Sequence, residues 1–156
     1  MEPARAGFPS LTNATTIGCE WVIDAFDCIP ERLRELETLR ALCDTIIREL
    51  QLHVVGEPMW HQFPGEAGVT GLYLLSESHL ACHTYPEVSM ATFNLYCCRT
   101  IPQWPWAETL QRQLGATHCD ILHFERGARR DPMQRGYPRS RGTAPLRESV
   151  QWESVP

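Results

Sequence analysis

A polar cluster follows an apolar, strand-like run near the middle of the chain. Its members are Ser76-Glu77-Ser78, His79, Cys82, His83 and Tyr85-Pro86-Glu87. A serine hydroxyl beside a strained peptide bond can attack the preceding carbonyl carbon and convert the amide bond into an ester. If Ser78 attacked the Glu77 carbonyl in this way, elimination would cut the chain and leave a pyruvoyl group, which is a reactive ketone. The alternative is an ordinary turn serine, and spacing alone leaves both interpretations open.

All 14 basic residues of the 156-residue sequence are arginines. Pyridoxal-phosphate enzymes hold their cofactor through a lysine, and Walker-type phosphate loops also need one. The lack of Lys excludes both kinds of site within this sequence. If the protein handles amines through an imine, the carbonyl must come from the chain itself or from a cofactor that is bound noncovalently.

Two groups of residues carry zinc-binding atoms, His79/Cys82/His83 and His118/Cys119/His123. His79 and His83 have no second matching ligand pair, and the sequence has no Cys-x-x-Cys motif. We therefore expect no metal. The seven cysteines are odd in number and irregularly spaced, and no signal peptide precedes them, which favours reduced thiols over a disulfide framework.

Charge is distributed unevenly along the chain. Residues 1–126 contain 8 Arg and 16 acidic residues, whereas residues 127–156 contain 6 Arg and 3 acidic residues. Scattered arginines without interleaved aromatic residues are a weak signal for nucleic acid, so we expect a disordered basic tail over 128–156, a flexible lead-in over 1–13 and no nucleic-acid partner. No run approaches the roughly 18 apolar residues of a membrane span, and this predicts a soluble, cytoplasmic protein without a membrane partner.

Apolar periodicity predicts the elements that position the polar cluster. Residues Glu31–Leu50 have apolar positions every three or four residues after Pro30, which predicts a helix. A second helix is expected at Trp106–Leu114. Strands are expected at Ile17–Phe26, Gln51–Val55, Val69–Leu75, His79–Thr84, Ser89–Cys97 and His118–Phe124. Ser78 therefore falls at the junction of two strands.

These elements predict an α+β fold, specifically a two-layer α/β sandwich with a mainly antiparallel sheet of about six strands and two helices on one face. We expect one domain over residues 14–127. Two helices cannot cover both faces of such a sheet, so the other face must be polar or must meet a second copy of the chain. We therefore predict a homodimer.

The polar cluster resembles a motif of the prokaryotic S-adenosylmethionine decarboxylase family. The similarity rests on Ser76-Glu77-Ser78-His79-Leu80, His83-Thr84-Tyr85-Pro86-Glu87, Cys98, Phe63-Pro64, Gly68-Val69-Thr70-Gly71 and Phe124-Glu125-Arg126-Gly127. Members of that family are proenzymes that cut themselves and use a pyruvoyl group as their cofactor. The resemblance implies cleavage after Glu77 into fragments 1–77 and 78–156, with the pyruvoyl group derived from Ser78 and forming a Schiff base with the substrate S-adenosylmethionine.

The resemblance also implies roles for other residues. His83 would assist β-elimination during cleavage, and Thr70 would support processing. Cys98 would return a proton to the substrate carbon after carbon dioxide leaves, whereas the adjacent Cys97 points to the opposite face of its strand and is expected in the core or an interface. The substrate-binding residues would be Phe63 and Tyr85, which would sandwich adenine, and Glu87, which would bind the ribose hydroxyls.

The sequence departs from the family pattern at three places, which are Tyr85 in place of the usual Trp, Val88-Ser89-Met90, and Cys19-Glu20-Trp21. Phenol offers a smaller stacking face than indole. Three functions therefore stay open: decarboxylation of S-adenosylmethionine for spermidine synthesis, pyruvoyl-dependent decarboxylation of ornithine or arginine, and a regulatory paralogue that never cleaves itself.

Overall fold

The computed structural model describes residues 17–127 and 146–151. The elements of these two segments are, in chain order, β1 (Gly18–Phe26), α1 (Pro30–Arg34), α2 (Leu36–Glu49), β2 (Met59–Gln62), β3 (Val69–Leu75), β4 (Ser78–Tyr85), the 3₁₀ turn η1 (Pro86–Val88), β5 (Met90–Cys97), α3 (Trp106–Leu114), β6 (His118–Arg126) and β7 (Leu146–Gln151). Within these segments, no helix has the length and apolar character needed to cross a membrane.

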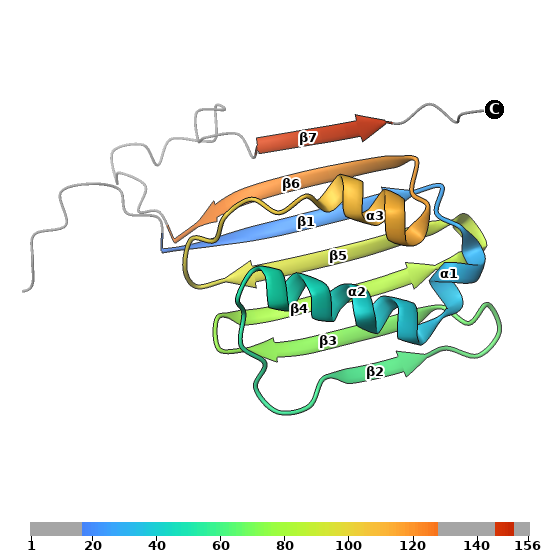
Figure 1. Ribbon diagram of the computed structural model, residues 1–156, viewed down its shortest axis with the longest axis horizontal. Helices are drawn as coiled ribbons and strands as arrows, with labels where there is room; N and C mark the ends of the chain where they lie inside the picture. The colour runs from blue at the N-terminus through green and yellow to red at the C-terminus, as the bar shows by residue number, and fades with distance from the viewer. Residues whose placement is uncertain (1–16, 128–145, 152–156) are drawn as a thin grey trace, which may run out of the picture.

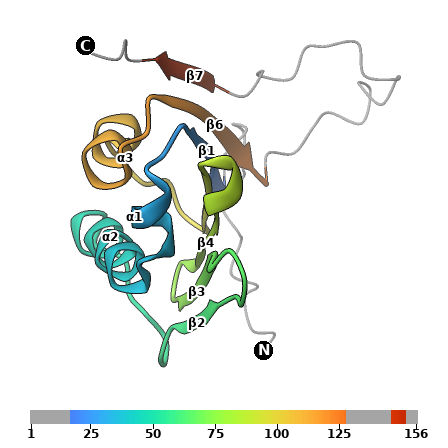
Figure 2. The same cartoon turned by 90° about the vertical axis from the view of Figure 1, so that its right-hand side faces the viewer.

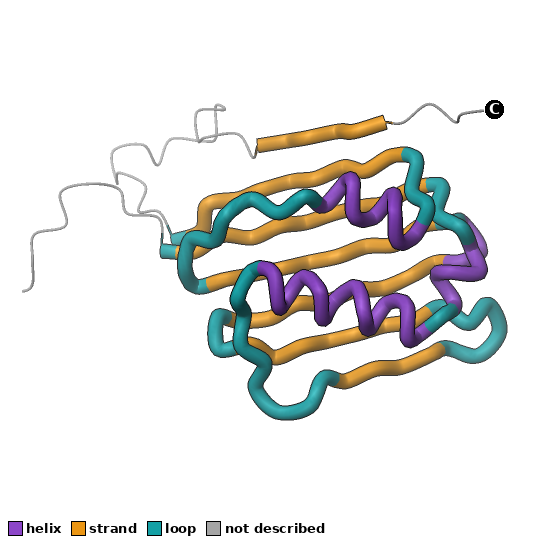
Figure 3. Tube along the Cα trace, in the orientation of Figure 1, coloured by secondary structure: helices purple, strands orange, loops and turns teal. Residues whose placement is uncertain are grey.

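The described strands form one antiparallel sheet in the order β2-β3-β4-β5-β1-β6-β7 (Figure 1). β1 lies between β5 and β6, so α1 and α2 lead from the middle of the sheet to β2, and α3 carries the chain from β5 past β1 to β6. Figures 2 and 3 show that the three helices lie on one face of the sheet. The predicted two-layer α+β sandwich is therefore confirmed, with seven strands and three helices among the described residues in place of about six and two.

The face of the sheet beneath the helices holds the apolar core. Along β5, half-buried and buried residues alternate strictly, and the buried set faces the helices. Trp106, Tyr73 and Phe93 are the largest fully enclosed side chains. Burial of each large apolar side chain contributes about 1.5–3 kcal/mol. A slip of one residue would turn the apolar set of a strand away from the helices, so this core fixes the register that places the polar cluster.

The single helix predicted for Glu31–Leu50 is interrupted, so that prediction was wrong at Glu35. Glu35 has an extended backbone, with φ −84° and ψ 99°. The Leu33 carbonyl, which a continuous helix would pair with the amide four residues on, accepts a hydrogen bond from Thr84 Oγ1 at 2.8 Å. The break therefore ties α1 to the end of β4.

Three short segments also differ from the expected elements. The strand predicted at Gln51–Val55 is reduced to a single bridge between Val54 and Leu75. Residues Met59–Gln62, for which no strand was predicted, form β2, and the Trp60 ring lies so close over Gly71 of β3 that a Cβ there would overlap the indole.

The third difference lies in the predicted disordered tail, where Leu146–Gln151 pairs with β6 as β7. The prediction was wrong for these six residues because their partner strand supplies the backbone hydrogen bonds, which the Arg- and Pro-rich composition around them does not reveal. The predictions for residues 1–13, 128–145 and 152–156 concern residues outside the described segments.

The face of the sheet away from the helices, called the open face below, mixes titratable and apolar side chains. Leu72 and Leu74 on β3 are exposed, Leu74 by 59%. The half-buried members on β4, β5 and β1 include His79, Ala81, His83, Tyr85, Met90, Thr92, Asn94, Tyr96, Glu20, Val22, Asp24 and Phe26. Most of the predicted polar cluster therefore lies along this face and at the ends of its strands, whereas Cys82 is buried in the core, 4.0 Å from the Cys43 thiol of α2.

Candidate active site

The Glu77–Ser78 peptide bond lies in a two-residue hairpin turn. β3 ends at Leu75 and β4 begins at Ser78, and these two residues pair across the turn. Two-residue hairpin loops usually place their positive φ angles within the loop. Here the positive φ, 149°, falls on Ser78 itself. A residue with a Cβ in this region carries strain of about 1–3 kcal/mol, so the backbone is strained at the residue that follows the predicted cleavage point.

The carbonyl of this bond has a well-placed donor. The Cys98 backbone N–H donates to the Glu77 carbonyl oxygen at 2.7 Å. Negative charge would develop on this oxygen if a nucleophile attacked the carbonyl carbon, and a fixed N–H donor stabilises such charge. The Cys98 side chain is exposed, whereas Cys97 is fully buried on the helix face, where burial raises the pKa of its thiol to about 12. Cys97 was predicted in the core or an interface, and it lies in the core.

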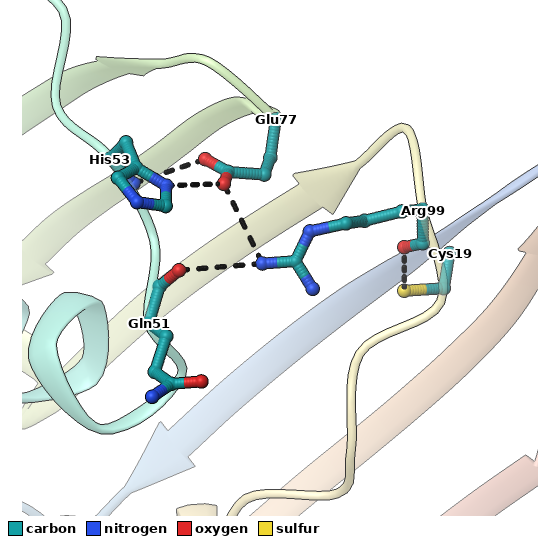
Figure 4. A network of polar contacts seen from close by, with 5 residues as sticks. All are labelled: Cys19, Gln51, His53, Glu77 and Arg99. Atoms are coloured by element: carbon teal, nitrogen blue, oxygen red, sulfur yellow. Dashed lines mark hydrogen bonds and ion pairs between the residues drawn. The ribbon is translucent and has the colours of Figure 1, made fainter.

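The Glu77 side chain is held by a separate polar network (Figure 4). It is only 7% exposed and accepts hydrogen bonds from the His53 backbone N–H at 3.1 Å and from the His53 ring at 2.9 Å, with an Arg99 nitrogen 3.5 Å away. Burial alone would raise the pKa of this carboxyl, but the two hydrogen bonds from His53 outweigh it and hold the pKa below the ordinary value of 4.5. The His53 carbonyl also accepts from the Ser76 N–H at 2.8 Å, so residue 53 fixes both residues of the turn.

The Ser78 hydroxyl contacts a chain of polar side chains on the open face. Ser78 Oγ lies 3.1 Å from His79 Nδ1, and His79 Nε2 lies 3.0 Å from Asn94 Oδ1. Asn94 Nδ2 in turn donates to Glu20 Oε1 at 2.9 Å. Glu20 forms an ion pair with Arg126. The chain therefore runs from β4 across β5 to β1 and β6.

Five predicted site residues gather at the other end of β4. Thr70 Oγ1 lies 2.5 Å from His83 Nδ1. The His83 ring is flanked by the rings of Phe63 and Tyr85, with centroids 5.5 and 4.4 Å away. Glu87 is exposed on η1, the short turn that directly follows Tyr85. A shallow depression of about 380 Å³ on the open face begins at Thr70 and His83.

The predicted site residues therefore form two groups. We call Glu77, Ser78 and Cys98 the cleavage end, and Phe63, Thr70, His83, Tyr85 and Glu87 the histidine end. Ser78 and His83 are five residues apart on one strand, which corresponds to about 16 Å. Within one chain, the structure does not bring these two residues together.

Sequence reasoning missed several residues of this region. His79 was considered only as a metal ligand, Glu20 only as a departure from the family pattern, and His53, Asn94 and Arg99 were not considered at all. Apart from His79, which directly follows Ser78, these residues lie far from the turn in sequence, and only the fold makes them its neighbours. The Cys98 N–H had no signal in the sequence because every residue except proline has such a donor.

Comparisons with known proteins match this architecture and both ends of β4. The family model of S-adenosylmethionine decarboxylase matches residues 19–127. The S-adenosylmethionine decarboxylase proenzyme of Prochlorococcus marinus (strain MIT 9313) is 31% identical over 112 residues, which cover 70% of this chain and 87% of that protein. The proenzyme of the same name from Thermococcus kodakarensis (strain ATCC BAA-918 / JCM 12380 / KOD1) is 27% identical over 122 residues, which cover 78% and 84%.

A solved structure gives the same result for the fold. The crystal structure of the adenosylmethionine decarboxylase from Aquifex aeolicus VF5 superimposes with a TM-score of 0.62 at 26% sequence identity, and the match covers 76% of this chain and 97% of that chain. The family match spans well over half of the sequence, and its range includes the strained turn, Cys97 at the end of β5, Cys98 directly after it, and the histidine end. This chain belongs to the S-adenosylmethionine decarboxylase family.

Proposed function

We propose that this protein is a self-processing, pyruvoyl-dependent decarboxylase that converts S-adenosylmethionine into decarboxylated S-adenosylmethionine, the aminopropyl donor for spermidine synthesis. The observation that carries the proposal is the Glu77–Ser78 bond, where a positive φ at Ser78 coincides with a 2.7 Å hydrogen bond from Cys98 N–H to the Glu77 carbonyl. Strain destabilises the bond before reaction, and the donor stabilises the oxygen as it gains negative charge. The substrate follows from family membership.

Self-cleavage would proceed in two stages. Ser78 Oγ attacks the Glu77 carbonyl carbon, and the C–N bond breaks to leave an ester and a free amine on residue 78. A base then removes the Ser78 Cα proton, which expels the Glu77 carboxylate and leaves dehydroalanine. Dehydroalanine takes up water and loses ammonia to give the pyruvoyl group. We assign the base of the second stage to His83, whose Nε2 is free when Nδ1–H donates to Thr70 Oγ1.

The surroundings of Ser78 fit a pyruvoyl group. Ser78 pairs with Leu75 on one side and with Cys97 on the other, so the new chain end would remain held in the sheet. Once formed, the group supplies a ketone that reacts with the substrate amine and takes up the electrons released as carbon dioxide leaves. The exposed thiol of Cys98, next to the residue that pairs with Ser78, is the candidate for returning a proton to the substrate carbon.

The distance between the two ends of β4 supports a homodimer. His83 lies about 16 Å along the strand from Ser78 of its own chain, too far to remove its proton. A twofold axis on the open face would place the histidine end of one copy against the cleavage end of the other, and would do so twice. The exposed Leu72 and Leu74 on this face would be buried in the same contact.

The histidine end also fits a role in substrate binding. The Phe63 and Tyr85 rings both border His83, so an adenine held by these rings would lie beside the residue that approaches Ser78 of the other copy. Glu87, exposed on the adjoining turn, is placed to accept hydrogen bonds from the ribose hydroxyls. Because Tyr85 stacks less area than a tryptophan would, we expect weaker adenine binding than with indole.

Denaturing electrophoresis and intact mass test the self-cleavage. The purified protein is expected to give fragments 1–77 and 78–156, the second carrying pyruvoyl in place of serine, and Ser78→Ala is expected to stay intact. Carbon dioxide release from S-adenosylmethionine, ornithine and arginine then tests the substrate. Cleavage with turnover of ornithine or arginine alone would replace the substrate assignment, and a wild-type chain that never cleaves would indicate a regulatory paralogue.

A further inference from the structure

The hydrogen bonds that leave the Ser78 hydroxyl cross the open face of the sheet. They join Ser78 to His79 at 3.1 Å, His79 to Asn94 at 3.0 Å and Asn94 to Glu20 at 2.9 Å. All four residues are half-buried, and they lie on strands whose register is fixed by the core on the opposite face. Neither the cleavage end nor the histidine end, as assigned above, uses His79, Asn94 or Glu20.

The charge of Glu20 decides the direction of every bond in this chain. Glu20 is paired with Arg126 and is therefore a carboxylate, which only accepts hydrogen bonds. The Asn94 amide must turn its NH₂ group toward Glu20, so its carbonyl oxygen faces His79. His79 Nε2 must then carry the ring proton and donate it to Asn94.

The tautomer of His79 has a direct consequence for Ser78. With the proton on Nε2, His79 Nδ1 presents a free lone pair at 3.1 Å from Ser78 Oγ. A hydroxyl paired in this way donates its proton to the imidazole, which is the arrangement of an activated serine nucleophile. The opposite tautomer would turn an N–H toward Ser78 and leave the hydroxyl without a base.

We propose that His79 is the general base of the first stage of self-cleavage, and that Asn94 and Glu20 are positioning residues that fix its tautomer. The inference rests on the self-cleavage proposed above. His79 Nδ1 takes the proton from Ser78 Oγ as the oxygen attacks the Glu77 carbonyl carbon, and returns it to the Ser78 nitrogen as the C–N bond breaks. No proton is gained or lost overall. Two histidines then divide the reaction: His79 forms the ester within its own chain, and His83 drives the later elimination.

Hydroxylamine distinguishes the two stages because it cuts an ester but leaves an ordinary peptide bond intact. It also cuts Asn-Gly bonds, and the sequence contains none. We expect His79→Ala to slow self-cleavage at least about 100-fold, the effect of removing a general base, and to yield no fragments with hydroxylamine because no ester forms. His83→Ala is expected to accumulate ester and to yield fragments 1–77 and 78–156 on treatment.

His79→Asn provides a second variant that keeps a polar side chain but has no base, and it is expected to behave like His79→Ala. The matched control is His118→Ala, which removes another part-buried histidine of the same sheet, one that contacts Asp120 at 3.3 Å and lies on β6 away from Ser78. This control is expected to cleave at the wild-type rate. Circular dichroism and the thermal transition show which variants keep the fold.

The positioning roles require a readout that simple loss of packing would not move. Asn94→Ala removes the acceptor that fixes the tautomer and is expected to slow ester formation about 10-fold or more. The double variant Asn94→Asp with Glu20→Gln reverses the polarity of the pair, keeps an acceptor for His79 Nε2 and is expected to restore most of the rate.

Wild-type speed in a folded His79→Ala, accumulation of its ester, or failure of the double variant to exceed Asn94→Ala would each overturn the assignment. If the wild-type chain itself never cleaves, the proposed function fails instead. The two failures are therefore distinguishable in one experiment.

Discussion

The two ends of β4 lie on the same strand but are built by different means. At the cleavage end, the important features belong to the backbone, namely the positive φ of Ser78 and the Cys98 N–H on the Glu77 carbonyl. At the histidine end, they belong to side chains, namely a hydroxyl on an imidazole and two aromatic rings around it. In the proposed mechanism, one end is the bond that breaks, and the other supplies a base and a stacking surface.

Under the proposed mechanism, neither end is sufficient alone. A strained bond without a base for elimination would stop at the ester, and a histidine among aromatic rings has nothing to act on within reach. An antiparallel pairing of two open faces would supply each end with what it lacks, because a twofold axis makes every such contact occur twice. The comparison therefore yields a specific expectation about which subunit supplies which residue.

Coexpression of two inactive variants gives the largest expected effect. Ser78→Ala and His83→Ala are each expected to remain uncut when expressed alone. In a mixed dimer, the His83→Ala chain keeps its own Ser78 and receives His83 from the Ser78→Ala chain. With equal, randomly paired chains, about half of the His83→Ala chains should therefore be cut. Different affinity tags on the two chains allow mass spectrometry to measure the fraction.

The control for this experiment is a Ser78→Ala chain that also carries His83→Ala, which has no histidine to donate and is expected to rescue nothing. If the mixture cleaves no more than either variant alone, His83 acts within its own chain or not at all. Cleavage of the Ser78→Ala chain in any mixture would contradict the role of Ser78 itself.

Much of this comparison could be predicted from the sequence. Alternation of apolar residues in Val69–Leu75 and Ser89–Cys97 indicated strands, and Ser78 was expected at the junction between strands because the Ser/Glu punctuation interrupts the apolar pattern. The spacing of Cys97 and Cys98 on one strand predicted that only one of them faces the core, and Cys97 does. Local patterns fix which face a residue occupies.

Strand order and backbone torsions lie beyond such patterns. Glu20 and Asn94 are 74 residues apart in sequence, and only the pairing of β1 with β5 brings them together. The break at Glu35 depends on Thr84, a residue about 50 positions later, taking up a helical carbonyl. The positive φ at Ser78 likewise has no signal in the local sequence, and the turn that contains it is held by His53 and Cys98, which lie far from it along the chain.

Cys98→Ala separates the two functions assigned to the cleavage end. The backbone N–H survives this substitution, so self-cleavage is expected to proceed, whereas loss of the thiol is expected to lower decarboxylation about 10²–10⁴-fold, as for other proton donors. Electrophoresis measures self-cleavage, and carbon dioxide release measures decarboxylation.

Cys97→Ala, with its thiol in the core, is the matched variant and is expected to keep turnover near the wild-type rate. If Cys98→Ala abolishes cleavage as well, the thiol and not the N–H serves the first reaction.

The smallest expected effect concerns the network that holds the Glu77 side chain. Its pKa in the folded protein is below 4.5, so its interactions with His53 and Arg99 stabilise the fold fully above that pH and are lost as the pH falls through the folded value. In the uncut Ser78→Ala background, Glu77→Gln is expected to lower the free energy of unfolding by about 1 kcal/mol at pH 7, and by less below pH 4.5. Urea unfolding at a series of pH values measures this.

The matched change at the histidine end, Glu87→Gln, removes an exposed carboxylate with no hydrogen bond to the described residues and is expected to have little effect at any pH. A pH-independent loss in Glu77→Gln would mean that the side chain acts through packing, and the cleavage end would then depend on its backbone contacts alone.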